Sequence, residues 1–93
     1  MDSTADTVIV EIMITATQCK MARVGLGWTQ EELAQRISVS ASTIKNFEAG
    51  RTIMPVITTA IAREFIEAGV VFVEEDAEFI PGVRLRKPKR GRR

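Results

Sequence analysis

Residues 28–50 constrain this chain more than any other stretch, because they predict two short helices joined by a tight turn. Thr29 and Glu32 have the spacing of a capping box, in which two side chains satisfy backbone N–H groups left free at a helix start. Ser40 can cap the second helix, and Gly50 is a typical helix stop. The positions predicted to face inward are apolar and recur at helical spacing: Leu33, Ala34, Ile37, Ile44 and Phe47.

Two helices of this length are not stable alone, because helix nucleation is costly and few turns follow it. The pattern therefore predicts a helix pair packed on further elements, with the small Ala34 allowing close approach and Val39 filling the corner. This arrangement is a helix-turn-helix, a motif whose second helix can enter the major groove of DNA.

The same stretch resembles the helix-turn-helix domain of the Cro and lambda-type repressors, also called the xenobiotic-response-element family. The matching residues are Gln30, Leu33, Ala34, Val39, Ser40, Ile44, Glu48, Gly50 and Pro55. The similarity covers about residues 15–68, and residues 68–88 (AGVVFVEEDAEFIPGVRLRKP) resemble a tail found on small bacterial members. Family members usually have glycine in the turn, where this chain has Ser38. If that residue is left-handed, serine costs on the order of 1 kcal/mol.

Further helices and short strands are predicted on either side of the motif. Cap and stop residues bound two more helices, and runs of β-branched residues predict strands. These elements are helices at 15–27 and 55–69 and strands at 8–14, 70–73 and 83–86. Val83 and Leu85 are predicted to face inward. The expected fold is mainly α: a four-helix Cro/repressor-like domain with a C-terminal β-hairpin and an N-terminal strand.

The charges are distributed unevenly, although the net charge is only +1. Seven of the thirteen basic residues lie near the C-terminus: Arg84, Arg86, Lys87, Lys89, Arg90, Arg92 and Arg93. Residues 1–83 carry six basic and twelve acidic side chains, a net charge of −6. We expect residues 1–7 to be a loose terminus, 8–86 a single domain, and 87–93 a disordered basic tail.

The composition favours a cytoplasmic protein that is not an enzyme. There is no membrane-spanning apolar run, no signal-peptide pattern, and a lone Cys19 that is typical of a reducing compartment. Histidine and tyrosine are absent, as are a Gly-rich phosphate loop and a metal-ligand spacing, so no cofactor or metal is expected. Cys19 is interpreted as core filler, and the acidic residues at 74–78 as a solvated turn, because they lack the pattern of a calcium loop.

Candidate DNA-contacting residues lie on the second helix and around it. The residues predicted to read bases are Ala41, Ser42, Thr43, Lys45 and Asn46. Asn46 is the strongest of them, because its amide can pair bidentately with adenine. The predicted contacts to the DNA backbone are Thr29, Gln30, Ser40 and Arg51, with Gln30 placed there by the resemblance. The basic tail has two interpretations, a DNA arm or a solubilising terminus.

The resemblance also places Arg23 against Glu48, as a partly buried ion pair between the first helix and the recognition helix. The alternative is two separate surface charges.

The sequence thus indicates a sequence-specific, double-stranded DNA-binding transcriptional regulator, a repressor by resemblance. The alternative is a protein-interaction module, such as an antiactivator or antitoxin, that sequesters a partner with the same fold. The acidic body disfavours nonspecific nucleic-acid packaging. We further predict a homodimer on a palindromic operator, joined through strands by the apolar residues Val8, Val10 and Ile12. The N-terminal strand is expected to pair with the hairpin either of its own chain or of the second chain.

Overall fold

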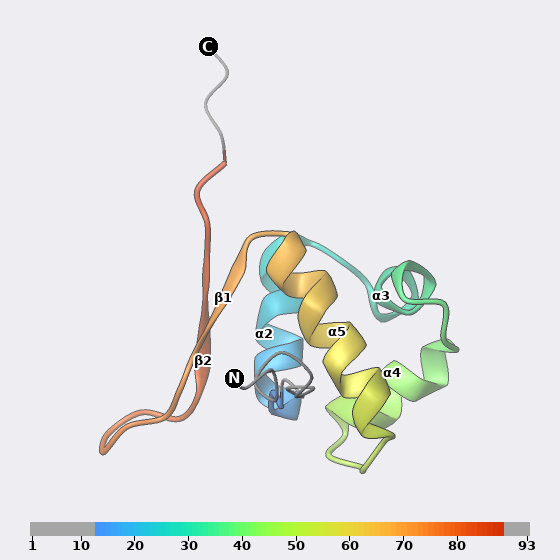
Figure 1. The fold of residues 1–93 in the computed structure, drawn as a ribbon, viewed down its shortest axis with the longest axis horizontal. Helices are drawn as coiled ribbons and strands as arrows, with labels where there is room; N and C mark the ends of the chain where they lie inside the picture. Colours follow the sequence, from blue (N-terminus) through green and yellow to red (C-terminus); the bar gives the residue numbers. More distant parts are fainter. Residues whose placement is uncertain (1–12, 89–93) are drawn as a thin grey trace, which may run out of the picture.

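A computed structural model of the chain describes residues 13–88. These residues form four helices followed by an antiparallel hairpin of two strands (Figure 1). The elements are α2 (Ala16–Leu26), α3 (Gln30–Arg36), α4 (Ala41–Glu48), α5 (Pro55–Glu67), β1 (Val70–Val73) and β2 (Gly82–Leu85). The expected mainly α fold with a C-terminal hairpin is confirmed. No helix among the described residues is long and apolar enough to cross a membrane.

Side-chain caps fix the starts of the first three helices. The hydroxyls of Thr15, Thr29 and Ser40 each accept a hydrogen bond from the backbone N–H three residues later. Gln18 and Glu32 accept in turn from the N–H of Thr15 and Thr29, which completes two capping boxes. These starts are therefore determined locally by the residues that the sequence singles out.

The turn between α3 and α4 is strained at one residue. Ser38 has a φ of 61°, in the left-handed region that favours glycine. The residue that replaces the usual glycine of the turn is therefore left-handed, as the sequence comparison with the family suggested. The next residue, Val39, donates its N–H to the Ala34 carbonyl at 3.0 Å. That bond satisfies a carbonyl near the end of α3.

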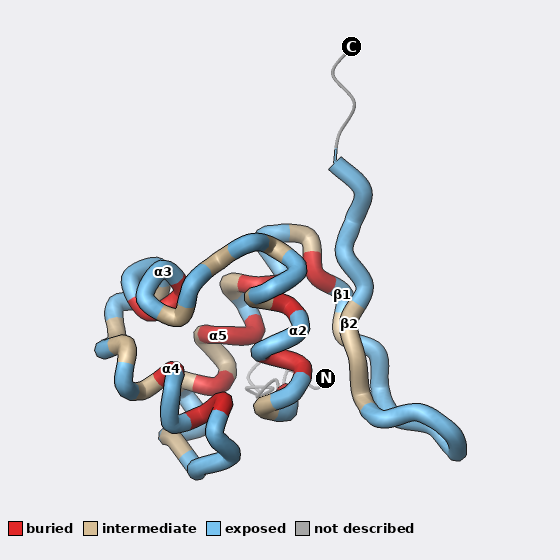
Figure 2. The backbone as a smooth tube through the Cα atoms, turned by 180° about the vertical axis from the view of Figure 1, so that it is seen from behind, coloured by how far each residue is buried: buried red, intermediate tan, exposed pale blue. Residues whose placement is uncertain are grey.

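All four helices contribute buried residues to the core (Figure 2), together with Ile14 and with Val70 of β1. The largest fully buried side chains are Phe65, Leu33, Ile44, Ile61, Val70 and Cys19. The Phe65 ring stacks on Trp28 at 5.7 Å between centroids and meets Phe72 of β1 edge-on at 6.3 Å. The Arg36 guanidinium covers the Trp28 ring at 3.8 Å from its centroid. Phe65 therefore joins the helical body to the hairpin.

The hairpin packs beside α2, with Phe72 opposite Val83 and Val70 opposite Leu85 on its inner face (Figure 1). Leu85 lies over Gly25 of α2, where an added Cβ would come within 2.7 Å of the Leu85 Cδ1 atom. A lone hairpin is only marginally stable in water, so this packing is what holds the strands in place.

Three sequence predictions about strands need correction. The second strand begins at Gly82 and ends at Leu85, one residue earlier at each end than predicted. Leu85 is on the inner face, over Gly25, but remains 41% exposed, whereas Val70 opposite it is 2% exposed. The predicted N-terminal strand does not include Met13 or Ile14; Ile14 is instead buried in the core. The remainder of that predicted strand, residues 8–12, lies outside the described residues.

Candidate nucleic-acid interface

Helix α4 has one buried face and one exposed face. Ile44, Phe47 and Glu48 face the body of the protein. Of the five predicted base readers, Ser42, Lys45 and Asn46 are exposed, whereas Ala41 and Thr43 are half-buried. The helix therefore presents the polar side chains of Ser42, Lys45 and Asn46 outward, on the face opposite its buried residues.

Two polar contacts organise this exposed face. The Asn46 Oδ1 atom accepts a hydrogen bond from Arg51 Nη1 at 3.2 Å. The Lys45 Nζ atom lies 3.7 Å from a Glu31 carboxylate oxygen, an exposed pair that contributes little to stability. The Arg51 bond orients the Asn46 amide, yet it leaves the NH₂ group and a second lone pair on the oxygen for another partner.

The predicted backbone contacts lie at the ends of the helix pair. Thr29 and Ser40 are exposed, and their hydroxyls already cap α3 and α4. The Ser40 Oγ atom also lies 3.0 Å from the hydroxyls of both Ser42 and Thr43. Arg51 is exposed in the loop that follows α4.

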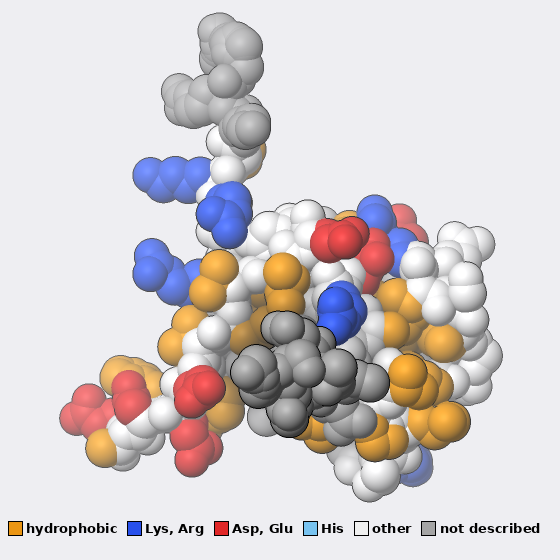
Figure 3. All heavy atoms as spheres, viewed as in Figure 1, with side chains coloured by type: hydrophobic (Ala, Val, Ile, Leu, Met, Phe, Trp, Pro, Cys, Tyr) orange, Lys and Arg blue, Asp and Glu red, His pale blue; other side chains and the backbone are white. Residues whose placement is uncertain are grey.

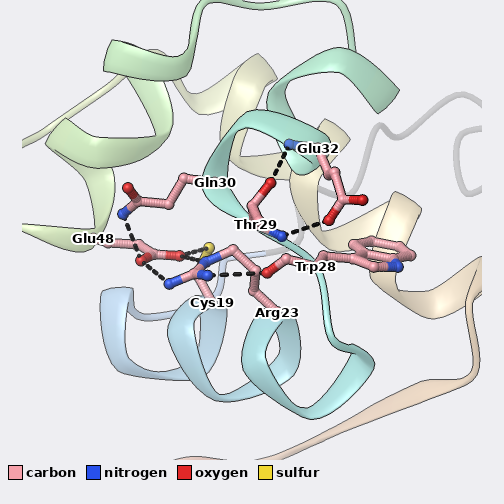
Figure 4. Close-up of polar contacts among 7 residues, drawn as sticks. All are labelled: Cys19, Arg23, Trp28, Thr29, Gln30, Glu32 and Glu48. Atoms are coloured by element: carbon pink, nitrogen blue, oxygen red, sulfur yellow. Dashed lines mark hydrogen bonds and ion pairs between the residues drawn. The ribbon is translucent and has the colours of Figure 1, made fainter.

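A buried carboxylate fixes α4 against α2 and α3 (Figure 4). Arg23 Nε and Nη2 donate to the two Glu48 oxygens at 2.8 and 2.9 Å. Gln30 Nε2 donates to the same carboxylate at 3.0 Å, and the Cys19 thiol donates at 3.3 Å. Arg23 Nη1 also donates to the Trp28 carbonyl at 3.0 Å. One carboxylate thus ties together α2, the start of α3 and the end of α4.

Comparison with known protein families agrees with this geometry. Residues 20–63, from within α2 to within α5, match the model of a family described as Helix-turn-helix. Residues 20–63 are a helix-turn-helix of the Cro and lambda-repressor type. This family consists of DNA-binding regulators, so the chain is in general terms a DNA-binding regulator. None of the curated proteins matches the chain. In the helix-turn-helix, α4 is the second helix, the position that the recognition helix has in this motif.

Hydrogen bonds and burial shift the pKa of the Glu48 carboxyl group in opposite directions. Burial alone would raise the pKa of Glu48, but hydrogen bonds from Arg23, Gln30 and Cys19 outweigh it and hold the pKa below its usual value. The hydrogen bond to Glu48 also raises the pKa of Arg23. Burial, together with the nearby Glu48 charge, raises the pKa of the Cys19 thiol far above its ordinary value. Cys19 is therefore an inert thiol that donates a hydrogen bond.

Gln30 has a contact that its predicted role does not include. Its amide nitrogen donates to Glu48 behind the helix-turn-helix, and the residue is half-buried. The amide is therefore held in a fixed place at the start of α3, and a contact from it to a DNA phosphate remains a proposal.

Gln18 joins α2 to the hairpin, a role that the sequence analysis did not predict. It is 5% exposed, and its Nε2 atom donates to the carbonyls of Gly82 at 2.9 Å and Val73 at 3.3 Å. Gln18 therefore fastens the last paired residues of the hairpin to α2. The Thr-x-x-Gln spacing from Thr15 signals its capping role, but no local pattern signals the contact with strands more than fifty residues away.

The remaining predicted site residues lie elsewhere. Arg84, Arg86 and Lys87 are exposed on the hairpin side of the helix-turn-helix domain, and Figures 1 and 2 place the hairpin and the recognition helix at opposite sides of the body. The rest of the basic tail, Lys89, Arg90, Arg92 and Arg93, lies outside the described residues. The predicted dimer residues Val8, Val10 and Ile12 also lie outside them.

Proposed function

We propose that this helix-turn-helix protein is a sequence-specific, double-stranded DNA-binding transcriptional regulator that acts as a dimeric repressor on a palindromic operator. The observation that carries the proposal is the division of α4 into two faces. Glu48 anchors one face to α2 and α3, while Ser42, Lys45 and Asn46 are exposed on the other. A recognition helix needs this combination of rigid support and outward polar groups.

Base reading is assigned first to Asn46. Its amide can donate to N7 and accept from N6 of adenine, and Arg51 sets which way the amide points. Lys45 can reach a guanine or a phosphate once it leaves Glu31, because their contact is exposed and 3.7 Å long. Ser42, Thr43 and Ala41 complete the proposed reading surface by contacts with base edges or a thymine methyl group.

Contacts to the DNA backbone are assigned to Thr29, Gln30, Ser40 and Arg51, which lie at the ends of the motif. The end of the basic tail, Lys89, Arg90, Arg92 and Arg93, is proposed to add phosphate contacts, because the exposed face of α4 itself carries little positive charge. The dimer is proposed because one domain of this size reads only a short half-site, and two-fold symmetry doubles the site. Repression is proposed from the resemblance to the Cro and lambda-type repressors.

Replacing Asn46 with alanine tests the assignment of α4 as the reading helix. The variant should lose about 1–3 kcal/mol of discrimination at one base pair of each half-site, because a bidentate contact is removed. The measurement is a titration of duplexes that differ from the preferred site by single base pairs. Gln35→Ala removes another exposed amide on the neighbouring helix and should leave both affinity and preference unchanged. An Asn46→Ala protein with unaltered base preference would exclude this groove assignment.

A further inference from the structure

An apolar hollow lies beside the end of α4, where the start of α2, the loop after α4 and the first turns of α5 meet. Its volume is about 280 Å³, and it is open to solvent. Its walls include Met13, Ile14, Ala16, Phe47, Arg51 and Ile53. All of these except Arg51 are apolar, so the hollow is suited to aliphatic side chains.

Apolar surface continues along the chain from this hollow. Ile53 in the wall is followed by Met54 and, in the first turn of α5, by Val56; these two side chains are 62% and 63% exposed. Figure 3 shows hydrophobic side chains gathered over the first turns of α5. Contiguous exposed apolar surface usually marks a place where another segment or molecule binds. The hollow is therefore expected to have an apolar occupant.

The chain itself enters α2 beside this hollow. Met13 is 66% exposed, whereas Ile14 is 6% exposed and belongs to the core. Neither residue is helical, and their unequal burial is the alternation of an extended backbone. When this alternation is continued toward the N-terminus, Val10 and Ile12 fall on the buried side with Ile14. Glu11 then falls on the exposed side with Met13.

We infer that the N-terminal segment of the same chain, residues 8–12, docks in this hollow with the side chains of Val10 and Ile12. The segment lies outside the described residues, and its sequence VIVEI has Glu11 as its single polar residue. A cavity of about 150 Å³ lined by aliphatic and aromatic side chains holds benzene, so a hollow of this size can take two aliphatic side chains. This placement differs from the pairing with the hairpin that the sequence analysis predicted.

The segment is the occupant because its tether ends in the wall of the hollow. Ile12 is bonded to Met13, a wall residue, and five residues span at most about 18 Å. Such a short tether gives the segment an effective concentration in the millimolar range. It also avoids the loss of translational and rotational freedom that a separate molecule suffers on binding.

Docking braces the end of α4. Phe47 lies in the last turn of α4 and in the wall of the hollow, and Arg51 lines the hollow just after the helix. The Arg51 backbone N–H donates to the Asn46 carbonyl at 2.9 Å, and its guanidinium donates to the Asn46 side chain at 3.2 Å. An occupied hollow therefore limits the movement of the residue that orients Asn46. The inference rests on the proposed function only for this purpose.

Combining one substitution in the segment with one in the wall tests the contact. Ile12→Ser and Ile53→Ser should each lower the thermal midpoint of the full chain by at least about 4 °C, because each removes apolar burial. The double variant should melt no more than about 2 °C below the less stable single variant, because residues that touch lose their mutual contact only once. As controls, Ile12→Ser with Val71→Ser, on the exposed side of the hairpin, should give additive shifts. Ile9→Ser, on the exposed side of the segment, should shift the midpoint by less than about 2 °C.

Cross-linking identifies the chain that supplies the segment. Val10→Cys with Thr52→Cys places one thiol in the segment and one at the exposed rim of the hollow. Cys19 does not compete for the reagent, because it is fully buried. A short bismaleimide, added to dilute protein without DNA, should give a product with the mass of one chain.

Additive shifts for Ile12→Ser and Ile53→Ser would overturn the inference, as would non-additive shifts for Ile12→Ser and Val71→Ser. A cross-linked product with the mass of two chains would also overturn it, because the segment would then fill the hollow of a second copy. None of these measurements depends on DNA. A wild type with the predicted coupling but no preference among duplex sequences would refute the proposed function and leave the docking of the segment intact.

Discussion

Replacing Glu48 with alanine is expected to lower the free energy of unfolding by about 3–5 kcal/mol. The Glu48 side chain is 2% exposed and that of Arg23 14%, so removing the carboxylate leaves a poorly solvated guanidinium without its partner. Gln30 and Cys19 lose their acceptor as well. Denaturant titration of the purified variant measures the change directly.

The Arg23→Met/Glu48→Met double variant is the matched control for this cluster. It removes both charges, so its loss of stability should be smaller than that of Glu48→Ala, because no unpaired buried charge remains. A Glu48→Ala protein that unfolds within about 1 kcal/mol of the wild type would contradict the burial of this pair.

Because Glu48 stabilises the fold in its charged form, we expect the protein to lose stability in acid. Because the folded-state pKa of Glu48 lies below the ordinary value of 4.5, its contribution is complete above that value and is lost as the pH falls through the folded-state pKa. Glu48→Gln keeps the shape of the side chain but not its charge. Its unfolding free energy should therefore fall less steeply with decreasing pH than that of the wild type.

Replacing Phe65 with alanine should cost about 3–5 kcal/mol, because the side chain is fully buried and its neighbours would border a cavity. Its ring contacts Trp28 on one side and Phe72 of β1 on the other. The variant should thus loosen the hairpin together with the helices. Trp28 is the only tryptophan of the chain, and its fluorescence reports the same change on the helical side.

Ile66→Ala is the control for Phe65→Ala, because it removes the neighbouring apolar side chain, which is 45% exposed. It should cost less than about 1 kcal/mol. Similar losses in the two variants would mean that Phe65 does not join the hairpin to the helical core.

The parts of the fold that were predictable from sequence are those fixed by neighbouring residues. Thr29 and Ser40 cap their helices through bonds that span three residues, and Pro55 occupies the first turn of α5. Helical periodicity likewise indicated which side of α4 is exposed, since Ile44 and Phe47 alternate with polar residues at the helical repeat. Local chemistry of this kind needs no knowledge of the rest of the chain.

Contacts between distant parts of the chain were the ones that sequence reasoning missed or misplaced. Gln18 reaches carbonyls 55 and 64 residues away, which no short pattern encodes. The exposure of Leu85 depends on how far the helices cover the inner face of the hairpin, because an alternating pattern specifies a face but not what covers it. The bond from Arg51 to Asn46 arises where the chain turns after α4, so it too depends on the folded path.

Selection of bound duplexes from a random pool tests the central claim, recognition of a DNA sequence by α4, most directly. The wild-type chain should enrich an inverted repeat whose half-sites are centred about 34–36 Å apart, one turn of the double helix. Asn46→Ala, selected in parallel, should lose the preference at one symmetric pair of positions. A wild-type pool that remains random, at salt concentrations where the protein still binds duplex DNA, would contradict sequence-specific recognition by this helix.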